Sequence, residues 1–185
     1  KILAESRRLL TLIEDIIRLS RLDEGVRGEV TPVDLTALIQ HCVQKLTPAA
    51  QNAQVSISAS GNDPVLISGD HALLEEMLTN LLENGIKYNH AGGYVRARAE
   101  MADGRAVVTV ADNGVGIAPE DQQRVFERFY RVDKSRSKQT GGTGLGLSIV
   151  KHGAQVHHAQ IAMQSALGEG TTITLTFPAQ SSGKK

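Results

Sequence analysis

The amino-acid sequence predicts an α+β fold: a two-layer sandwich in which helices cover one face of a mixed sheet, preceded by one long amphipathic helix. Two strand–turn–strand patterns, around Asp103-Gly104 and Gly168-Glu169-Gly170, predict β-hairpins. Two segments, 34–50 and 70–87, repeat apolar residues at the steps of an amphipathic helix. Strands and helices come in runs, which favours one mixed sheet with helices on one side.

The first 27 residues are expected to form part of a separate helical unit. Their wide apolar stripe needs burial against other helices in a bundle or dimer, or, alternatively, against the chain's own domain. We expect residues 28–33, which include Thr31-Pro32, to be a linker, and residues 180–185 to be a polar tail. The apolar positions of the first helix are Ile2, Leu9, Leu12, Ile13, Ile16, Ile17 and Leu19.

Residues 34–179 are expected to form the α+β unit. Asp34 and Asp70 precede the two helical patterns as candidate N-caps, and the second helix runs to about Lys87. Pro119 predicts the start of a short helix, and the aperiodic residues 127–143 predict a mobile loop before a helix over 144–157. The predicted strands are Gln54–Ser60, Val65–Ile67, Tyr94–Met101, Arg105–Ala111, Ile161–Ala166 and Thr171–Phe177.

The composition excludes several function classes. Lysine plus arginine and aspartate plus glutamate both total 20, so the net charge is zero and gives no argument for nucleic-acid or membrane binding. Aromatic residues make up 3% of the chain, which argues against base-stacking platforms. The single cysteine, Cys42, excludes an internal disulfide and is expected to be a buried thiol. The sequence has no apolar run long enough to span a bilayer and no signal peptide. Residue 1 is a lysine in the middle of a helical pattern, so we expect a piece of a longer protein.

Three segments carry possible chemistry. Gly141–Gly146 opens a helix, where glycines and the helix N-terminus suit an anion, or it is a flexible linker. Asp112 follows a strand and precedes two glycines, a position that suits recognition of an exocyclic amine or marks an ordinary turn. Asn80, Asn84 and Lys87 share one helix face, where Asn84 could bind Mg²⁺, although an isolated helical asparagine is commonly a surface residue.

The combination and order of these segments resemble the sensor histidine kinases. Asn84, Asp112, Phe126–Arg131, Gly142–Leu147 and Gly168–Thr171 resemble that family's N box, first glycine box, F box, second glycine box and third glycine box. Arg128–Asp133 resembles the phosphate-regulon and cell-wall-stress types. Leu19–Asp23 is similar to the end of the second helix of the family's dimerisation and phosphotransfer hairpin, so the resemblance covers nearly the whole chain.

The resemblance implies a catalytic ATP-binding domain of the GHKL type over residues 34–179, with ATP and Mg²⁺ as cofactors. It implies that Asn84 holds the metal, that Asp112 accepts from the adenine amino group, that Thr171 supports the adenine through water, and that Arg131 reaches the terminal phosphates. It assigns catalytic roles to Asn80, Lys87 and Arg131. The implied nucleotide contacts are Asn84, Lys87, Tyr88, Asp112, Gly114, Gly116, Ile117, Tyr130, Arg131, Gly142, Thr143, Gly144, Leu145, Gly146, Leu147 and Thr171.

The resemblance also bears on the reaction. ATP-hydrolysing relatives such as the gyrase B subunit and Hsp90 carry a glutamate at the position of Asn80, and an amide cannot serve as general base. Phosphate transfer to a histidine is therefore expected, although none of the six histidines has the family's acceptor pattern. The implied partners are ATP or ADP, a response-regulator receiver domain and a second copy in the full-length protein, which would lie in the bacterial membrane with this part in the cytoplasm. The alternatives are a nucleotide-binding module without activity of its own and a GHKL ATPase.

Overall fold

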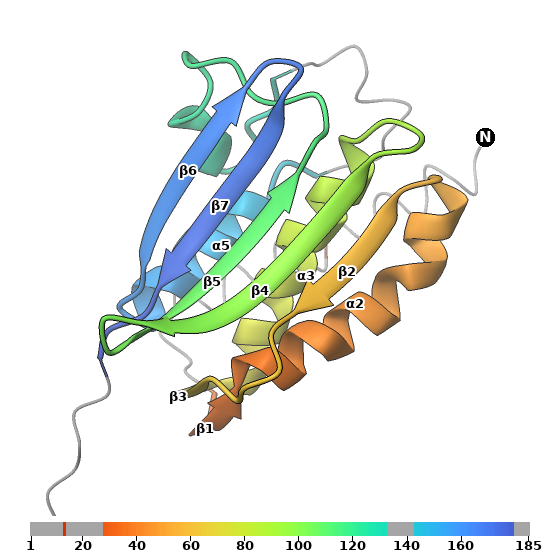
Figure 1. The fold of residues 1–185 in the computed structure, drawn as a ribbon. Helices are drawn as coiled ribbons and strands as arrows, with labels where there is room; N and C mark the ends of the chain where they lie inside the picture. Colours follow the sequence, from red (N-terminus) through yellow and green to blue (C-terminus); the bar gives the residue numbers. More distant parts are fainter. Residues whose placement is uncertain (1–12, 14–27, 133–142, 180–185) are drawn as a thin grey trace, which may run out of the picture.

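The computed structural model describes residues 13, 28–132 and 143–179, and it has the predicted two layers (Figure 1). A five-stranded sheet in the order β2-β4-β5-β7-β6 forms one layer, and helices α2, α3 and α5 cover one of its faces. Residues 1–12, 14–27, 133–142 and 180–185 lie outside the described part, and with them most of the predicted first helix, most of the predicted loop over 127–143 and the polar tail. The helices are α2 (Leu35–Asn52), α3 (His71–Lys87), the 3-10 helix η1 (Arg124–Phe126) and α5 (Gly146–Val156). The strands are β1 (Val30–Asp34), β2 (Ser56–Ser60), β3 (Leu66–Asp70), β4 (Tyr94–Ala102), β5 (Arg105–Asp112), β6 (Gln160–Ala166) and β7 (Gly170–Thr176).

The sheet is mixed, as predicted. Strand β2 runs parallel to β4, whereas the β4–β5, β5–β7 and β6–β7 pairs are antiparallel. Alternate residues of the central strands are buried against the helices, and the residues between them lie on the open face. The buried residues of β4 and β5 are Val95, Ala97, Ala99, Ala106, Val108 and Val110.

Both predicted N-caps are confirmed. The Asp34 carboxylate accepts from the Thr36 N–H at 3.0 Å, and the Asp70 carboxylate accepts from the Leu73 N–H at 3.1 Å. The predicted inner face of α3 is buried, and Cys42 is buried on α2 beside it, where burial raises the pKa of its thiol. These helices therefore follow the apolar period of the sequence closely.

The segment expected to be a linker contains a strand. Residues 30–34 form β1, which pairs antiparallel with β3 and brings Val30 opposite Asp70. Proline at position 32 is tolerated because this sheet has two strands, which leaves each with an unpaired edge. The same pairing extends β3 to Asp70, beyond the predicted end at Ile67.

One further local prediction is corrected. The helix expected to start at Pro119 is a series of turns over 119–123, followed by η1. The side chain of Gln122 holds this segment by donating to the Ile117 carbonyl at 3.1 Å. The end of α5 has a left-handed residue although glycine is absent there, because His158 adopts φ 53°.

Candidate functional site

Three polar side chains form one row across the sheet at the end where β5 finishes. Asp112, the last residue of β5, lies opposite Thr171, and Thr171 lies opposite Ser165 on β6. Side chains two residues apart on a strand lie on the same face of the sheet. Each of the three lies two residues from a residue on the helix-covered face: the buried Val110, the buried Ile173 and the partly buried Met163, respectively. The row therefore lies between the sheet and the helices.

The two oxygens of the Asp112 carboxylate differ. One accepts from the Gly114 N–H at 2.8 Å and from the Thr171 N–H at 3.3 Å. The other accepts no hydrogen bond from any residue that the structure describes. Burial raises the pKa of this carboxyl, and the bonds from Gly114 and Thr171 oppose that shift. Asp112 thus offers one oriented acceptor in a half-buried setting.

The glycines after Asp112 are required by close backbone contacts. A side chain on Gly114 would clash with the Tyr88 carbonyl, which also accepts from the Val115 N–H at 3.0 Å. Gly116 has φ +68°, and a Cβ there would clash with the Ala166 carbonyl in the β6–β7 hairpin. The segment after β5 is consequently held between the end of α3 and this hairpin.

Helix α3 contributes an amide and a cation. Asn84 is half-buried, and its side chain makes no hydrogen bond within the described residues, so its carboxamide oxygen fits a hard cation such as Mg²⁺. Burial lowers the pKa of the Lys87 ammonium, and the positive charge of Arg131 lowers it further, whereas the negative charge of Glu83 raises it. The Lys87 ammonium lies 5.2 Å from the centre of the Tyr88 ring. Two cations therefore influence each other at this end of α3.

Asn80 is bonded to its own helix, since its side-chain amide donates to the Glu76 carbonyl at 2.9 Å. Its oxygen borders the start of α5, where a Cβ on Gly146 would lie 2.7 Å from it. The missing side chain of Gly146 thus lets α5 begin against Asn80.

The residues just before α5 are packed against the F-box segment. The Phe129 N–H donates to the Gly144 carbonyl at 2.9 Å, and Gly144 has φ +77°. Leu145 is fully buried, and its N–H donates to the Thr143 hydroxyl at 3.3 Å. Helix α5 starts at Gly146, which is followed by Leu147. The first N–H groups of the helix have no acceptor within it, as at any helix N-terminus. Gly142 lies outside the described residues.

The Tyr130 hydroxyl is engaged within the protein. It donates to the Asp121 carboxylate, and this bond raises the pKa of the phenol. The Arg124 guanidinium lies 4.2 Å from the centre of the ring. Tyr130 is therefore held against the turn and η1, and Arg131 follows directly after it.

Ser165 and Gln122 also contact this site, and neither was predicted from the sequence. The Ser165 hydroxyl contacts Ile117, Gly170 and Thr171, and the Gln122 side chain donates to the Ser165 carbonyl at 2.9 Å. The period of β6, counted from Ile161, puts residue 165 on the buried face, and this signal could have drawn attention to it.

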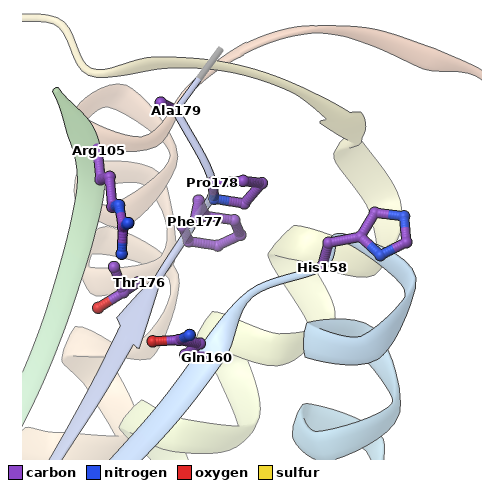
Figure 2. Close-up of a pocket in the computed structure, with 7 residues that line it drawn as sticks. All are labelled: Arg105, His158, Gln160, Thr176, Phe177, Pro178 and Ala179. Atoms are coloured by element: carbon purple, nitrogen blue, oxygen red, sulfur yellow. The ribbon is translucent and has the colours of Figure 1, made fainter. Parts of the chain in front are cut away.

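A separate pocket of about 220 Å³ lies at the opposite end of the sheet, where β7 ends and β6 begins (Figure 2). A second hollow beside it shares Pro178 and is lined also by Leu66 and Met101. Neither contains a residue that the sequence assigns to the nucleotide. The lining of the first pocket is Arg105, His158, Gln160, Thr176, Phe177, Pro178 and Ala179.

The described residues hold no cluster of three or more histidine, cysteine, aspartate or glutamate side chains able to bind a metal ion. None of the helices in the described part has the length and apolar character needed to cross a membrane.

Comparison with known proteins decides the family. Residues 69–181, which include the whole Asp112–Thr171–Ser165 row, match the family of histidine kinase-, DNA gyrase B- and HSP90-like ATPases. The chain belongs to this family. Within the family, the resemblance to sensor histidine kinases is confirmed by its relatives and by the solved structures that share its fold.

Among the relatives is the sensor-like histidine kinase SenX3 of Mycolicibacterium smegmatis, 42% identical over 96% of this chain and 47% of SenX3. The phosphate regulon sensor protein PhoR of Pseudomonas aeruginosa is 38% identical over 95% of this chain and 40% of PhoR. The crystal structure of full-length ShkA in complex with AMPPNP matches 94% of this chain and 36% of ShkA, with a TM-score of 0.81 and 30% identity. The chain thus spans less than half the length of these relatives.

The raised pKa of Asp112 leads to a prediction about stability. A carboxyl whose pKa is higher in the folded state favours folding below its unfolded pKa and loses that contribution as the pH rises through the folded pKa. Asp112→Asn removes the buried charge and keeps an acceptor for Gly114 and Thr171. We expect the variant to have a higher free energy of unfolding than the wild type at about pH 7, and the difference to shrink towards about pH 4.

Urea unfolding of both proteins across this pH range measures the effect. Asp103→Asn, in the exposed β4–β5 turn, is the matched control and should change little at either pH. An Asp112→Asn protein that is less stable than the wild type at neutral pH would contradict the assigned cost of burying the charge.

Proposed function

We propose that this chain is the ATP-binding and catalytic portion of a sensor histidine kinase, which passes the γ-phosphate of ATP to a histidine and from there to an aspartate of a response-regulator receiver domain. The observation that carries the proposal is the Asp112 carboxylate, with one oxygen fixed by Gly114 and Thr171 and the other left as a single acceptor. The family and its nucleotide-bound relative ShkA support the same reading.

Asp112 selects the adenine. An ionised carboxylate only accepts hydrogen bonds, so its second oxygen is complementary to the amino group of adenine. A half-buried setting strengthens this interaction because water competes less for both groups. Gly114 and Gly116 keep side chains out of the segment beside it, and Thr171 lies next to Asp112 in the row.

The polyphosphate lies toward the end of α3 and the start of α5 in this proposal. Lys87 and Arg131 supply positive charge, and the mutual effect of their charges supports a shared position near the phosphates. The N–H groups of Gly146 and Leu147 add donors at the N-terminus of α5, where an anion is favoured. Asn84 would hold Mg²⁺, which supplies charge neutralisation for the phosphates when bound.

Transfer to an imidazole fits Asn80 better than hydrolysis does. Its amide has no basic site, and its N–H group is already engaged with the Glu76 carbonyl. A neutral imidazole is nucleophilic without a strong base, whereas water needs one. Positioning of the phosphates by Lys87 and Arg131 would then carry most of the catalysis.

We extend the proposal to the whole protein because its relatives are longer sensor histidine kinases. It would act as a homodimer that contains the phosphate-accepting histidine, and residues 1–27 would contribute a helix to the dimerisation unit. The parent protein would be anchored in the bacterial membrane, with this portion in the cytoplasm.

Nucleotide binding is the first test. We expect ADP with Mg²⁺ to bind the wild-type chain, and Asp112→Asn to weaken binding by roughly 10- to 100-fold, because the new amide donor opposes the amino group of adenine. Isothermal titration calorimetry gives both dissociation constants, and Asp103→Asn is again the matched control. Equal affinity of Asp112→Asn and wild type would remove Asp112 from the site.

The role of Asn84 is tested by the metal dependence of binding. Wild-type affinity for ADP should be higher with Mg²⁺ than with EDTA, and Asn84→Ala should lose most of this difference because a metal ligand is gone. Asn52→Ala, at the exposed end of α2, should keep it. If Asn84→Ala retained the full effect of Mg²⁺, the metal would be bound elsewhere.

Hydrolysis provides the third test. We expect no sustained phosphate release from ATP by the wild-type chain, because Asn80 cannot activate water. A steady-state phosphate assay measures this, and Asp112→Asn gives the background from contaminating enzymes. Multiple turnovers above that background would favour an ATPase instead.

A further inference from the structure

The Ser165 hydroxyl is the centre of a hydrogen-bond network beside Thr171. Its oxygen lies 2.8 Å from the Ile117 amide nitrogen, 2.9 Å from the Gly170 carbonyl oxygen and 2.8 Å from the Thr171 hydroxyl oxygen. These three partners come from the segment after β5 and from the start of β7. The Ser165 side chain on β6 therefore joins the segment after β5 to the start of β7, beside the proposed adenine position.

The direction of each bond follows from counting protons. A serine hydroxyl has one proton to donate and two lone pairs to accept with. The Gly170 carbonyl can only accept, so the Ser165 proton goes there, and the Ile117 N–H can only donate, so it takes one lone pair. The remaining lone pair accepts from Thr171, whose hydroxyl must be the donor in that bond.

This assignment fixes the character of Thr171. Its single proton is committed to Ser165, so the hydroxyl can only accept from a further group. Its backbone N–H is committed to Asp112 at 3.3 Å. The row then presents two acceptors side by side, the second oxygen of Asp112 and the hydroxyl oxygen of Thr171.

We propose that Ser165 is a specificity-determining positioning residue, which holds Thr171 as an acceptor so that the site takes an amino-bearing purine and rejects an oxo-bearing one. The inference rests on the proposed function, since it takes the purine to lie against Asp112. An amino group can donate a proton directly to each acceptor, whereas an oxo group would face lone pairs on both.

The network is built to hold Ser165 in place. Gln122 donates to the Ile117 carbonyl at 3.1 Å and to the Ser165 carbonyl at 2.9 Å, which joins the same two segments a second time. The Gly168 N–H donates to the Val115 carbonyl at 2.9 Å and closes the hairpin over them. Loss of the Ser165 hydroxyl should therefore free the Thr171 hydroxyl to rotate while the backbone stays in place.

The test compares ADP with inosine diphosphate, which carries an oxo group in place of the amino group. We expect Ser165→Ala to reduce the preference for ADP over inosine diphosphate by roughly fivefold to tenfold, the equivalent of one hydrogen bond. Displacement of a fluorescent ADP analogue from the whole chain gives both affinities. Ser165→Thr keeps the hydroxyl and should restore the wild-type preference.

A merely structural role predicts a different outcome. If Ser165 only stabilised the fold, Ser165→Ala would weaken both nucleotides by the same factor and leave the preference unchanged, which would overturn the proposal. Thr174→Val is the control, because Thr174 lies on the open face of β7 and its side chain makes no hydrogen bond within the described residues.

A double-mutant cycle tests whether Ser165 acts through Thr171. With Thr171→Val the acceptor is gone, so adding Ser165→Ala should no longer change the preference. An equal change in both backgrounds would show that Ser165 does not act through Thr171. Failure of the wild type to bind ADP would instead contradict the proposed function, so the two failures are distinct.

Discussion

The register between β5 and β7 is the constraint on which the site depends. It sets Asp112 opposite Thr171, and the next pairing sets Thr171 opposite Ser165. A shift of one residue would turn every side chain of β7 to the other face and replace Thr171 in the row. Close backbone contact stabilises the register, because Gly170, at φ +96°, packs against the Asp112 carbonyl where any side chain would clash. The polar row is therefore a consequence of sheet geometry.

Helix α3 links this row to the proposed phosphate side of the site. Its leucines are buried against the sheet and α2, while Asn84 and Lys87 lie on its half-buried side. The missing side chain of Gly85 allows close approach to β4 and β5, since a Cβ there would lie 3.0 Å from Val95 and 3.5 Å from the Asp112 Cβ. Gly153 likewise lets α5 pack on Met77, which offsets the roughly 1 kcal/mol that a glycine costs within a helix. Core packing thus sets the distance between the proposed adenine and phosphate ends.

The sequence predicted the features whose signals are local. The capping aspartates, the apolar faces of α2 and α3 and the hairpin at Asp103-Gly104 depend on neighbouring residues, and the structure has each of them. Strand β1 was missed because its partner β3 is distant in sequence. The helix expected at Pro119 is absent because the Gln122 side chain ties that segment to β6. Ser165 was missed for a similar reason: its chemistry arises only when two other segments meet it. Asp112 and Thr171 could be named because they lie in recognisable motifs, although their pairing could not.

The electrostatics of the site connect these observations with ligand binding. Burial raises the pKa of Asp112 and lowers that of Lys87, so both charged forms are disfavoured by the fold. The hydrogen bonds to Asp112 and the charge of Glu83 offset only part of each cost. A ligand that brings a donor to Asp112 and negative charge to Lys87 and Arg131 offsets both costs together, since each charge then gains a partner in a partly dehydrated setting. Such a ligand stabilises the folded chain by mass action. ATP has these two ends, and the proposed site, with the Asp112 carboxylate and the Lys87 and Arg131 cations, is complementary to it.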